Sequence, residues 1–238
     1  MNRVLERLRG GGSARAIWMV LGSVALAELA AEAGPDAIVF DRQHGTWDDA
    51  ALMAAVGVCG DATPLVRVAA NRPELIGAAL DAGAQGVIVP LVESAAEAAA
   101  AVRAAHYPPR GVRSGGGMRP LRDMGAYVAA AATETLVAVM IETAAGLTNA
   151  AEIAATPDVD LVFIGPGDLG LAVGSAALEM SIARIQAACA EAPMASGIYT
   201  SGPDAAARRL AQGFRFVVAE DDVHLPRTGF AAALKATA

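Results

Sequence analysis

An α/β fold, the (β/α)8 TIM barrel, is the fold class that this sequence predicts, and three observations lead to it. Short apolar runs alternate with alanine-rich stretches of helical composition, which is typical of a parallel sheet covered by helices. Eight such repeats occupy 238 residues, and barrels of this kind contain roughly 250 residues in one domain. An open doubly wound sheet is the alternative, but no G-x-G-x-x-G motif follows the first run. We therefore expect residues 1–238 to form a single barrel domain.

The apolar runs are nearly continuous, as expected of strands that are buried on both faces. The expected strands cover residues 17–21, 37–41, 64–68, 86–90, 136–142, 161–165, 195–199 and 214–219. The expected helices cover residues 23–33, 48–59, 73–82, 95–105, 149–155, 177–191, 203–212 and 226–235. Residues 1–12 are interpreted as a short extra helix that ends in a flexible G-G-G sequence.

The connection between residues 105 and 135 is unusually long and is expected to be an irregular loop. Such loops are often functional, and the loops that follow the strands of a barrel form its active face. Arg113 and Arg119 in this loop could bind an acidic substrate or form ion pairs that hold the loop. His106 and His224 lack a comparable context, so surface or loop positions are expected for them.

The composition excludes several classes of function. A net charge of −7 argues against nucleic-acid binding, and no segment is long enough to span a membrane. The 55% apolar content leaves apolar surface for a subunit interface. An arginine-rich start before an apolar run resembles a signal peptide, but Glu6 interrupts it and the run is needed as the first strand. Cys59 and Cys189 are interpreted as buried thiols, and we expect a cytoplasmic protein.

Two of the expected strands end in an acidic residue at equivalent places. Glu142 follows one run, and Asp168 follows the next run and a glycine-rich turn. Two carboxylates brought together repel each other unless one is protonated or a cation lies between them. We therefore predict a divalent metal site, with helix capping as the alternative for each acid. Glycines beside Asp168, among them Gly167, would let backbone amides approach a bound carboxylate.

Other strand ends contribute a histidine and an arginine to the same rim. His44 follows the second strand, with Asp41 close enough in sequence to orient its imidazole as a general base. Arg67 ends the third strand, where an unpaired buried charge would be costly. This arginine either pairs with a protein acid or binds an anionic substrate.

The near absence of lysine restricts the chemistry. A 2-oxo acid can be activated for cleavage of a carbon–carbon bond by a lysine imine or by a divalent cation that stabilises the enolate. Lys235, at the tail, is the only lysine. The sequence therefore favours a metal-dependent aldolase.

These residues lie in motifs that resemble the HpcH/HpaI aldolases, metal-dependent pyruvate aldolases of the phosphoenolpyruvate/pyruvate barrel superfamily. The resemblance extends from Trp18 to about Ala219. It is carried by F-D-R-Q-H-G at residues 40–45, L-V-R at 65–67, G-V-I-V-P-L-V at 86–92, Y-P-P-R-G-V-R-S at 107–114, M-I-E-T at 140–143 and F-I-G-P-G-D-L at 163–169.

The resemblance implies a role for each candidate residue. Glu142 and Asp168 would bind Mg²⁺, Mn²⁺ or Co²⁺, and the backbone at Gly167 and Asp168 would hold the pyruvate carboxylate. His44 and Asp41 would be an acid/base pair, and Arg67 would stabilise the enolate. Asp81 matches a position that reaches the site of a neighbouring subunit. The resemblance also implies a hexamer, a trimer of dimers, that cleaves or forms 4-hydroxy-2-oxo acids from pyruvate or hydroxypyruvate and an aldehyde.

The chain departs from the family pattern at several positions. Gln43 and Met140 replace polar residues of some members, and Met140 loses a possible substrate contact. Arg42 adds positive charge at the rim, and the tail after Ala219 is short. Two alternatives stay open: an acyl-CoA lyase of the citramalyl-CoA type, which would need a basic surface, and a non-catalytic barrel that binds a 2-oxo acid.

Overall fold

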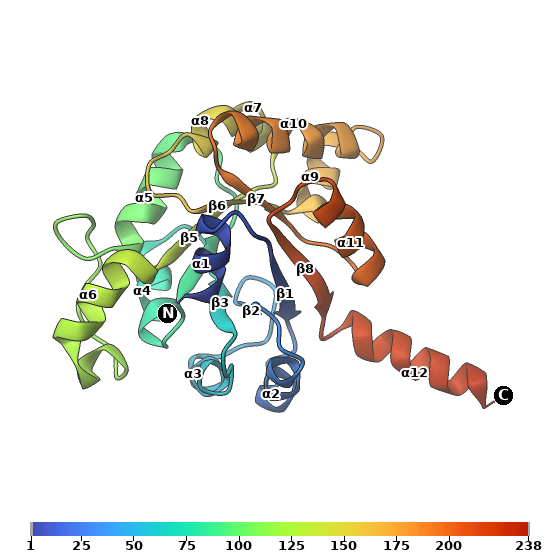
Figure 1. The fold of residues 1–238 in the computed structure, drawn as a ribbon, viewed down its shortest axis with the longest axis horizontal. Helices are drawn as coiled ribbons and strands as arrows, with labels where there is room; N and C mark the ends of the chain where they lie inside the picture. Colours follow the sequence, from blue (N-terminus) through green and yellow to red (C-terminus); the bar gives the residue numbers. More distant parts are fainter. Residues whose placement is uncertain (1, 238) are drawn as a thin grey trace.

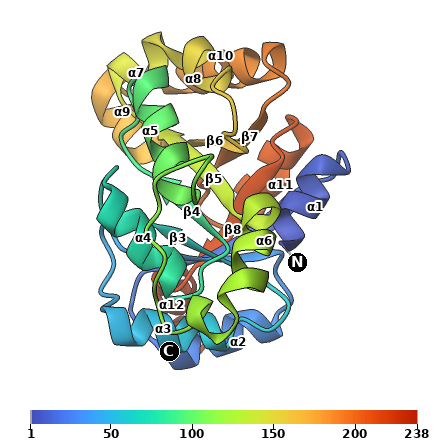
Figure 2. The same cartoon turned by 90° about the vertical axis from the view of Figure 1, so that its left-hand side faces the viewer.

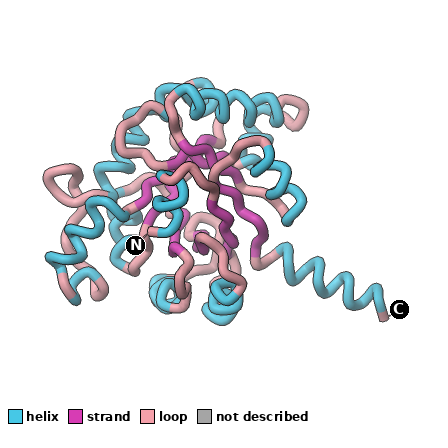
Figure 3. The backbone as a smooth tube through the Cα atoms, in the orientation of Figure 1, coloured by secondary structure: helices cyan, strands magenta, loops and turns pink. Residues whose placement is uncertain are grey.

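The computed structural model describes residues 2–237 and contains a closed barrel of eight parallel strands, each paired with the next and the last with the first. Figure 1 shows the barrel coloured along the sequence, and Figure 3 shows the strands at the centre with the helices outside. The predicted (β/α)8 barrel is therefore confirmed. The strands are β1 (Ala14–Met19), β2 (Ala37–Asp41), β3 (Thr63–Arg67), β4 (Gly86–Val89), β5 (Leu136–Ile141), β6 (Leu161–Ile164), β7 (Ala195–Ile198) and β8 (Phe216–Asp221).

The helices lie outside this barrel, and Figure 2 shows α4, α5 and α6 covering one side of it. Several begin at capping residues that the sequence supplies; Ser23, Asp48 and Ser94 each accept a hydrogen bond from the first turn of their helix. The helices are α1 (Arg3–Arg9), α2 (Val24–Glu32), α3 (Asp49–Gly57), α4 (Pro73–Asp81), α5 (Ala95–Ala105), α6 (Met124–Glu134), α7 (Ala144–Thr148), α8 (Ala150–Ala154), α9 (Pro166–Val173), α10 (Leu178–Glu191), α11 (Pro203–Ala211) and α12 (His224–Ala236), with a short 3-10 turn η1 (Pro120–Arg122).

Some predicted boundaries were wrong. Strand β1 begins three residues earlier than expected, and β8 runs from 216 to 221 rather than from 214 to 219. The stretch expected to be a long irregular loop contains η1 and all of α6, which begins where Asp123 accepts a hydrogen bond from the amide of Ala126. Helices α7 and α9 were also not predicted, because each is short and contains glycine.

The alternation of side chains along each strand divides the core into two layers. One layer fills the interior of the barrel and contains Trp18, Met140, Phe163 and Phe216; the other lies between the strands and the helices. The extra N-terminal helix, α1, contributes Val4 and Leu5 to the interior layer. In a strand, residues two apart share a face. A residue two positions after an interior residue therefore also points inward, and at the end of a strand it points into the mouth of the barrel.

The last helix differs from the others. Figure 1 shows α12 extending away from the barrel, and none of its described residues is buried. Leu225, Phe230 and Leu234 on this helix are all more than half exposed. No helix within residues 2–237 has the length and apolar character needed to cross a membrane.

Candidate active site

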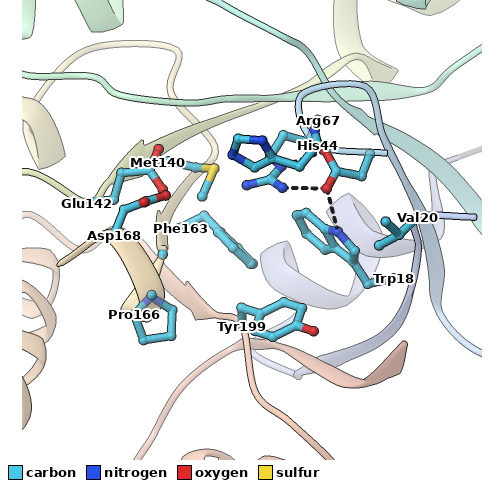
Figure 4. A pocket seen from close by; sticks show the side chains of 13 residues that line it. Trp18, Val20, His44, Arg67, Met140, Glu142, Phe163, Pro166, Asp168 and Tyr199 are labelled. Atoms are coloured by element: carbon cyan, nitrogen blue, oxygen red, sulfur yellow. Dashed lines mark hydrogen bonds and ion pairs between the residues drawn. The ribbon is translucent and has the colours of Figure 1, made fainter. Parts of the chain in front are cut away.

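A pocket of about 260 Å³ lies at the carboxyl ends of the strands, where side chains of several strands converge (Figure 4). It is lined by the predicted residues Asp41, His44, Arg67, Glu142 and Asp168, together with Gly167. Asp41 and Arg67 end β2 and β3, each two residues after an interior residue of its strand. Glu142 likewise lies two residues after Met140, an interior residue of β5. The strand geometry therefore brings together the residues that the sequence placed at this rim.

The acid pair lies at one end of the pocket, where the labelled side chains of Glu142 and Asp168 face each other (Figure 4). Oε1 of Glu142 accepts a hydrogen bond of 2.9 Å from the amide of Leu91, while Oε2 is buried without a partner among residues 2–237. Burial raises the pKa of the Glu142 carboxyl, and the nearby charge of Asp168 adds to this effect. The cap of α7 is supplied by Thr143 instead, so helix capping does not explain Glu142.

Gly165 makes room for this pair. A Cβ atom at Gly165 would lie 2.3 Å from Oε2 of Glu142, so a larger residue would displace the carboxylate. A Cβ atom at Gly167 would meet nothing within 4 Å. At Gly165 the group that approaches the backbone closely is therefore a protein side chain, the Glu142 carboxylate. Gly167 lines the pocket with its backbone.

The residues present fit a hard divalent cation. A buried carboxylate oxygen without a partner, beside a second carboxylate, is the donor set that Mg²⁺ uses when water and substrate complete its shell. Among residues 2–237 no group of three or more His, Cys, Asp or Glu side chains could hold a metal ion. Two protein ligands are consistent with that finding, since Mg²⁺ is usually bound by one or two carboxylates.

Asp41 is occupied by Arg67 rather than by the His44 ring. Its carboxylate accepts two hydrogen bonds from the Arg67 guanidinium, one of 2.9 Å to Oδ1 and a shorter one to Oδ2. It also accepts a hydrogen bond from Nε1 of Trp18 and from the amides of Gln43 and His44. Burial alone would raise the pKa of Asp41, but the hydrogen bonds and charge of Arg67 lower it below its usual value.

The predicted contact in which Asp41 orients the imidazole of His44 is therefore corrected. Asp41 contacts the backbone amide of His44, at 3.1 Å, and no hydrogen bond within residues 2–237 joins it to the ring. The reason is register: Asp41 and Arg67 are paired neighbours on β2 and β3, which places both side chains on the same face. The His44 ring itself points into the pocket near Arg67 (Figure 4).

The same strand register explains the surroundings of the Arg67 side chain. Of the two predicted roles, pairing with a protein acid is the one that the structure contains. The guanidinium carbon lies 5.0 Å from the centre of the Trp18 ring, and the residue is 9% exposed. Arg67 is thus held rigidly and still lines the pocket, where an anionic oxygen could reach it.

Asp81 does not line this pocket. It ends α4 and accepts a hydrogen bond of 2.8 Å from Arg113, which is 4% exposed and lies over the rings of both Tyr107 and Tyr127. The Asp81 side chain is about one-third exposed. A buried arginine that packs on two aromatic rings thus holds a partly exposed carboxylate.

The other candidates are structural. Arg119 donates a 2.6 Å hydrogen bond to the carbonyl oxygen of Met53. Neither Arg113 nor Arg119 lines the pocket. His106 lies in the loop directly after α5, one of its two expected positions, but it is only 3% exposed, and burial lowers its pKa to about 4. His224 pairs with Glu220 at the start of α12. Both cysteines are buried and free, as predicted.

An aromatic wall of the pocket was not predicted from the sequence. Trp18, Phe163 and Tyr199 line it, and the Trp18 ring is 5.7 Å from Phe163 and 5.6 Å from Tyr199. The hydroxyl of Tyr199 donates a hydrogen bond to Asp221. The signal was present in the alternation of side chains, because Trp18 and Phe163 belong to the interior layer.

Residues 15–225 of the chain match the family model described as HpcH/HpaI aldolase/citrate lyase. The chain belongs to this family. The HpcH/HpaI chain is 39% identical to a hydroxypyruvate/pyruvate aldolase of Rhizorhabdus wittichii over 234 residues, which covers 94% of this chain and 93% of that protein. It is 35% identical to a 4-hydroxy-2-oxovalerate aldolase of Rhodococcus jostii, over 94% and 92% of the two chains. The crystal structure of an HpcH/HpaI aldolase/citrate lyase family protein from Burkholderia cenocepacia superposes with a TM-score of 0.95 at 32% identity, covering 100% of this chain and 99% of that one.

Proposed function

We propose that this protein is a divalent metal-dependent aldolase, a carbon–carbon lyase. It would cleave and form 4-hydroxy-2-oxo acids, with pyruvate or hydroxypyruvate and an aldehyde as the two halves. The single observation that carries the proposal is the buried Oε2 of Glu142, which has no partner among residues 2–237 and lies beside Asp168 in a pocket that Arg67 and His44 also line. The names of the R. wittichii and R. jostii relatives support the same reaction class.

Glu142 and Asp168 would hold Mg²⁺, Mn²⁺ or Co²⁺. When bound, the cation supplies Lewis-acid stabilisation of negative charge on the 2-oxo group. The backbone at Gly167 and Asp168 lines the same end of the pocket and would bind the substrate carboxylate. Arg67, fixed by Asp41, would donate to the oxygen on which charge develops.

His44 would move the proton of the C4 hydroxyl. In the cleavage direction the ring takes that proton, the C3–C4 bond breaks, its electron pair passes into the enolate, and the aldehyde leaves. A proton then returns to C3 to give pyruvate. In this scheme Asp41 acts on Arg67 and positions it, which differs from the acid/base pairing that the sequence predicted.

A second copy of the chain would complete the site. The partly exposed Asp81 carboxylate, held by Arg113, would reach the pocket of a neighbouring subunit and pair there with the His44 ring. The apolar residues of α12, which residues 2–237 leave exposed, would pack on another subunit. We propose a hexamer built as a trimer of dimers. The buried free thiols Cys59 and Cys189 favour a reducing compartment, so we place it in the cytoplasm.

Mixed oligomers test the role of Asp81. His44→Ala and Asp81→Ala proteins are each expected to be impaired, yet subunits of the two mixed and reassembled should form some sites with both native side chains. At equal amounts, about a quarter of the sites should be intact if chains assort randomly. Reassembled single variants are the controls. Activity of the mixture equal to the average of the two variants would show that Asp81 does not act across the interface.

The reaction itself is tested by incubating the protein with Mn²⁺, pyruvate and short aldehydes and identifying the products by NMR. A 4-hydroxy-2-oxo acid is expected, with loss of the reaction after chelation. The acyl-CoA lyase alternative has less support because Lys235 is the only lysine that could help to form a basic surface. Cleavage of citramalyl-CoA to acetyl-CoA and pyruvate, with no aldol product, would favour that alternative. No product and no exchange at C3 of pyruvate would favour the non-catalytic barrel.

A further inference from the structure

The two ends of the pocket differ in chemistry. Glu142 and Asp168 lie at one end, and Trp18, Val20 and Tyr199 lie toward the other (Figure 4). If the proposed function is correct, the 2-oxo acid occupies the acidic end. The aldehyde then extends toward the wall formed by Trp18, Val20 and Tyr199, which we call the distal wall.

The distal wall is apolar because its polar atoms are already used. Nε1 of Trp18 donates to Asp41, at 3.3 Å, and the hydroxyl of Tyr199 donates to Asp221. The rings of Trp18 and Tyr199 meet edge to face with their centres 5.6 Å apart. Trp18 is 3% exposed and packed against Phe163, so the wall is held in place. Its side chains therefore offer carbon surface to a ligand.

The charges that line the pocket favour an uncharged partner. Its acids are Asp41, Glu142 and Asp168, and its basic side chains are Arg67 and His44. The charge of Arg67 is matched by the two hydrogen bonds to Asp41. An additional carboxylate or phosphate on the aldehyde would therefore meet no unpaired arginine or lysine among the residues lining this pocket. Burying a charge without a partner is costly.

We propose that Val20 and Tyr199, with Trp18 behind them, form the aldehyde subsite and select short uncharged aldehydes over aldehydes that carry a carboxylate or a phosphate. The cavity of about 260 Å³ must also hold the 2-oxo acid, which restricts the aldehyde to a few carbon atoms. The discrimination against charged aldehydes is expected to be large, because a buried polar group left without a partner costs more than a lost apolar contact.

The experiment compares two aldehydes of the same length, butanal and succinate semialdehyde, by kcat/KM with pyruvate and Mn²⁺. The semialdehyde is expected to be worse by about 10-fold or more. Its methyl ester, which is uncharged, should regain most of the difference. Equal values, or a preference for the semialdehyde over butanal, would overturn the inference.

A pair of variants locates the subsite. Val20→Lys places a cation at the distal wall, and Val20→Met is the matched uncharged control. The ratio of kcat/KM for succinate semialdehyde to that for butanal should rise about 10-fold in Val20→Lys relative to Val20→Met. An unchanged ratio in a folded Val20→Lys protein would show that the aldehyde lies elsewhere.

Exchange of the C3 protons of pyruvate with deuterium, measured without aldehyde, separates this inference from the proposed function. Exchange does not require the distal wall. Intact exchange with the wrong aldehyde preference contradicts the subsite and leaves the aldolase assignment in place. Absence of both exchange and aldol product contradicts the proposed function, and the subsite with it.

Discussion

Glu142→Gln is expected to abolish measurable turnover, with kcat falling by about 1,000-fold or more. The substitution keeps the shape of the side chain and the acceptor for the Leu91 amide, but removes one of the two anionic ligands of the proposed metal site. Loss of Lewis-acid stabilisation is worth several kcal/mol, and each 1.36 kcal/mol corresponds to about a factor of ten in rate. Metal titration by calorimetry and exchange at C3 of pyruvate should both be impaired.

The stability of the metal-free protein distinguishes this effect from unfolding. Burial raises the pKa of Glu142, so the folded state favours the protonated form and loses stability as the pH rises through that raised pKa. The neutral glutamine does not have this cost. Metal-free Glu142→Gln should therefore be at least as stable as the native protein at pH 8. Glu152→Gln, an exposed glutamate on α8, is the matched control. Full activity of Glu142→Gln after thorough chelation would exclude Glu142 as a metal ligand.

His44→Ala is expected to lower aldol turnover by about 100-fold or more while leaving metal binding unchanged. General acid–base catalysis by a placed side chain contributes about 100- to 10,000-fold. The His44 ring faces the pocket, and Asp41 does not replace it as a base because its carboxylate is bound by Arg67. Turnover should be followed in the cleavage direction, where the C4 hydroxyl loses its proton.

Added imidazole provides the control for His44. The cavity left by the alanine should admit imidazole and restore part of the activity, while the metal affinity of the variant matches that of the native protein. Native turnover in His44→Ala would remove the ring from the mechanism. A parallel loss of metal affinity would instead indicate that the substitution disturbs the acid pair.

The sequence by itself determined the barrel and the composition of its rim. Continuous apolar runs can be buried only in a sheet covered on both faces, and parallel strands place their carboxyl ends at the same edge. That reasoning alone brought Glu142, Asp168, His44 and Arg67 to the one pocket in which the structure has them. The apolar helix α6 and the short helices α7 and α9 were missed, because glycine and loop-like flanks concealed them.

Only the tertiary structure decided which side chains are partners. Sequence proximity suggested that Asp41 would orient His44, but the register of β2 against β3 sets Asp41 beside Arg67. The hydrogen bond from Arg113 to Asp81 joins positions 32 residues apart, and two tyrosine rings pack on the Arg113 guanidinium. The physical reason is the same in both cases. The position of a residue along the chain fixes the strand end that it occupies, whereas its hydrogen-bond partner depends on distances across elements that only the closed barrel defines.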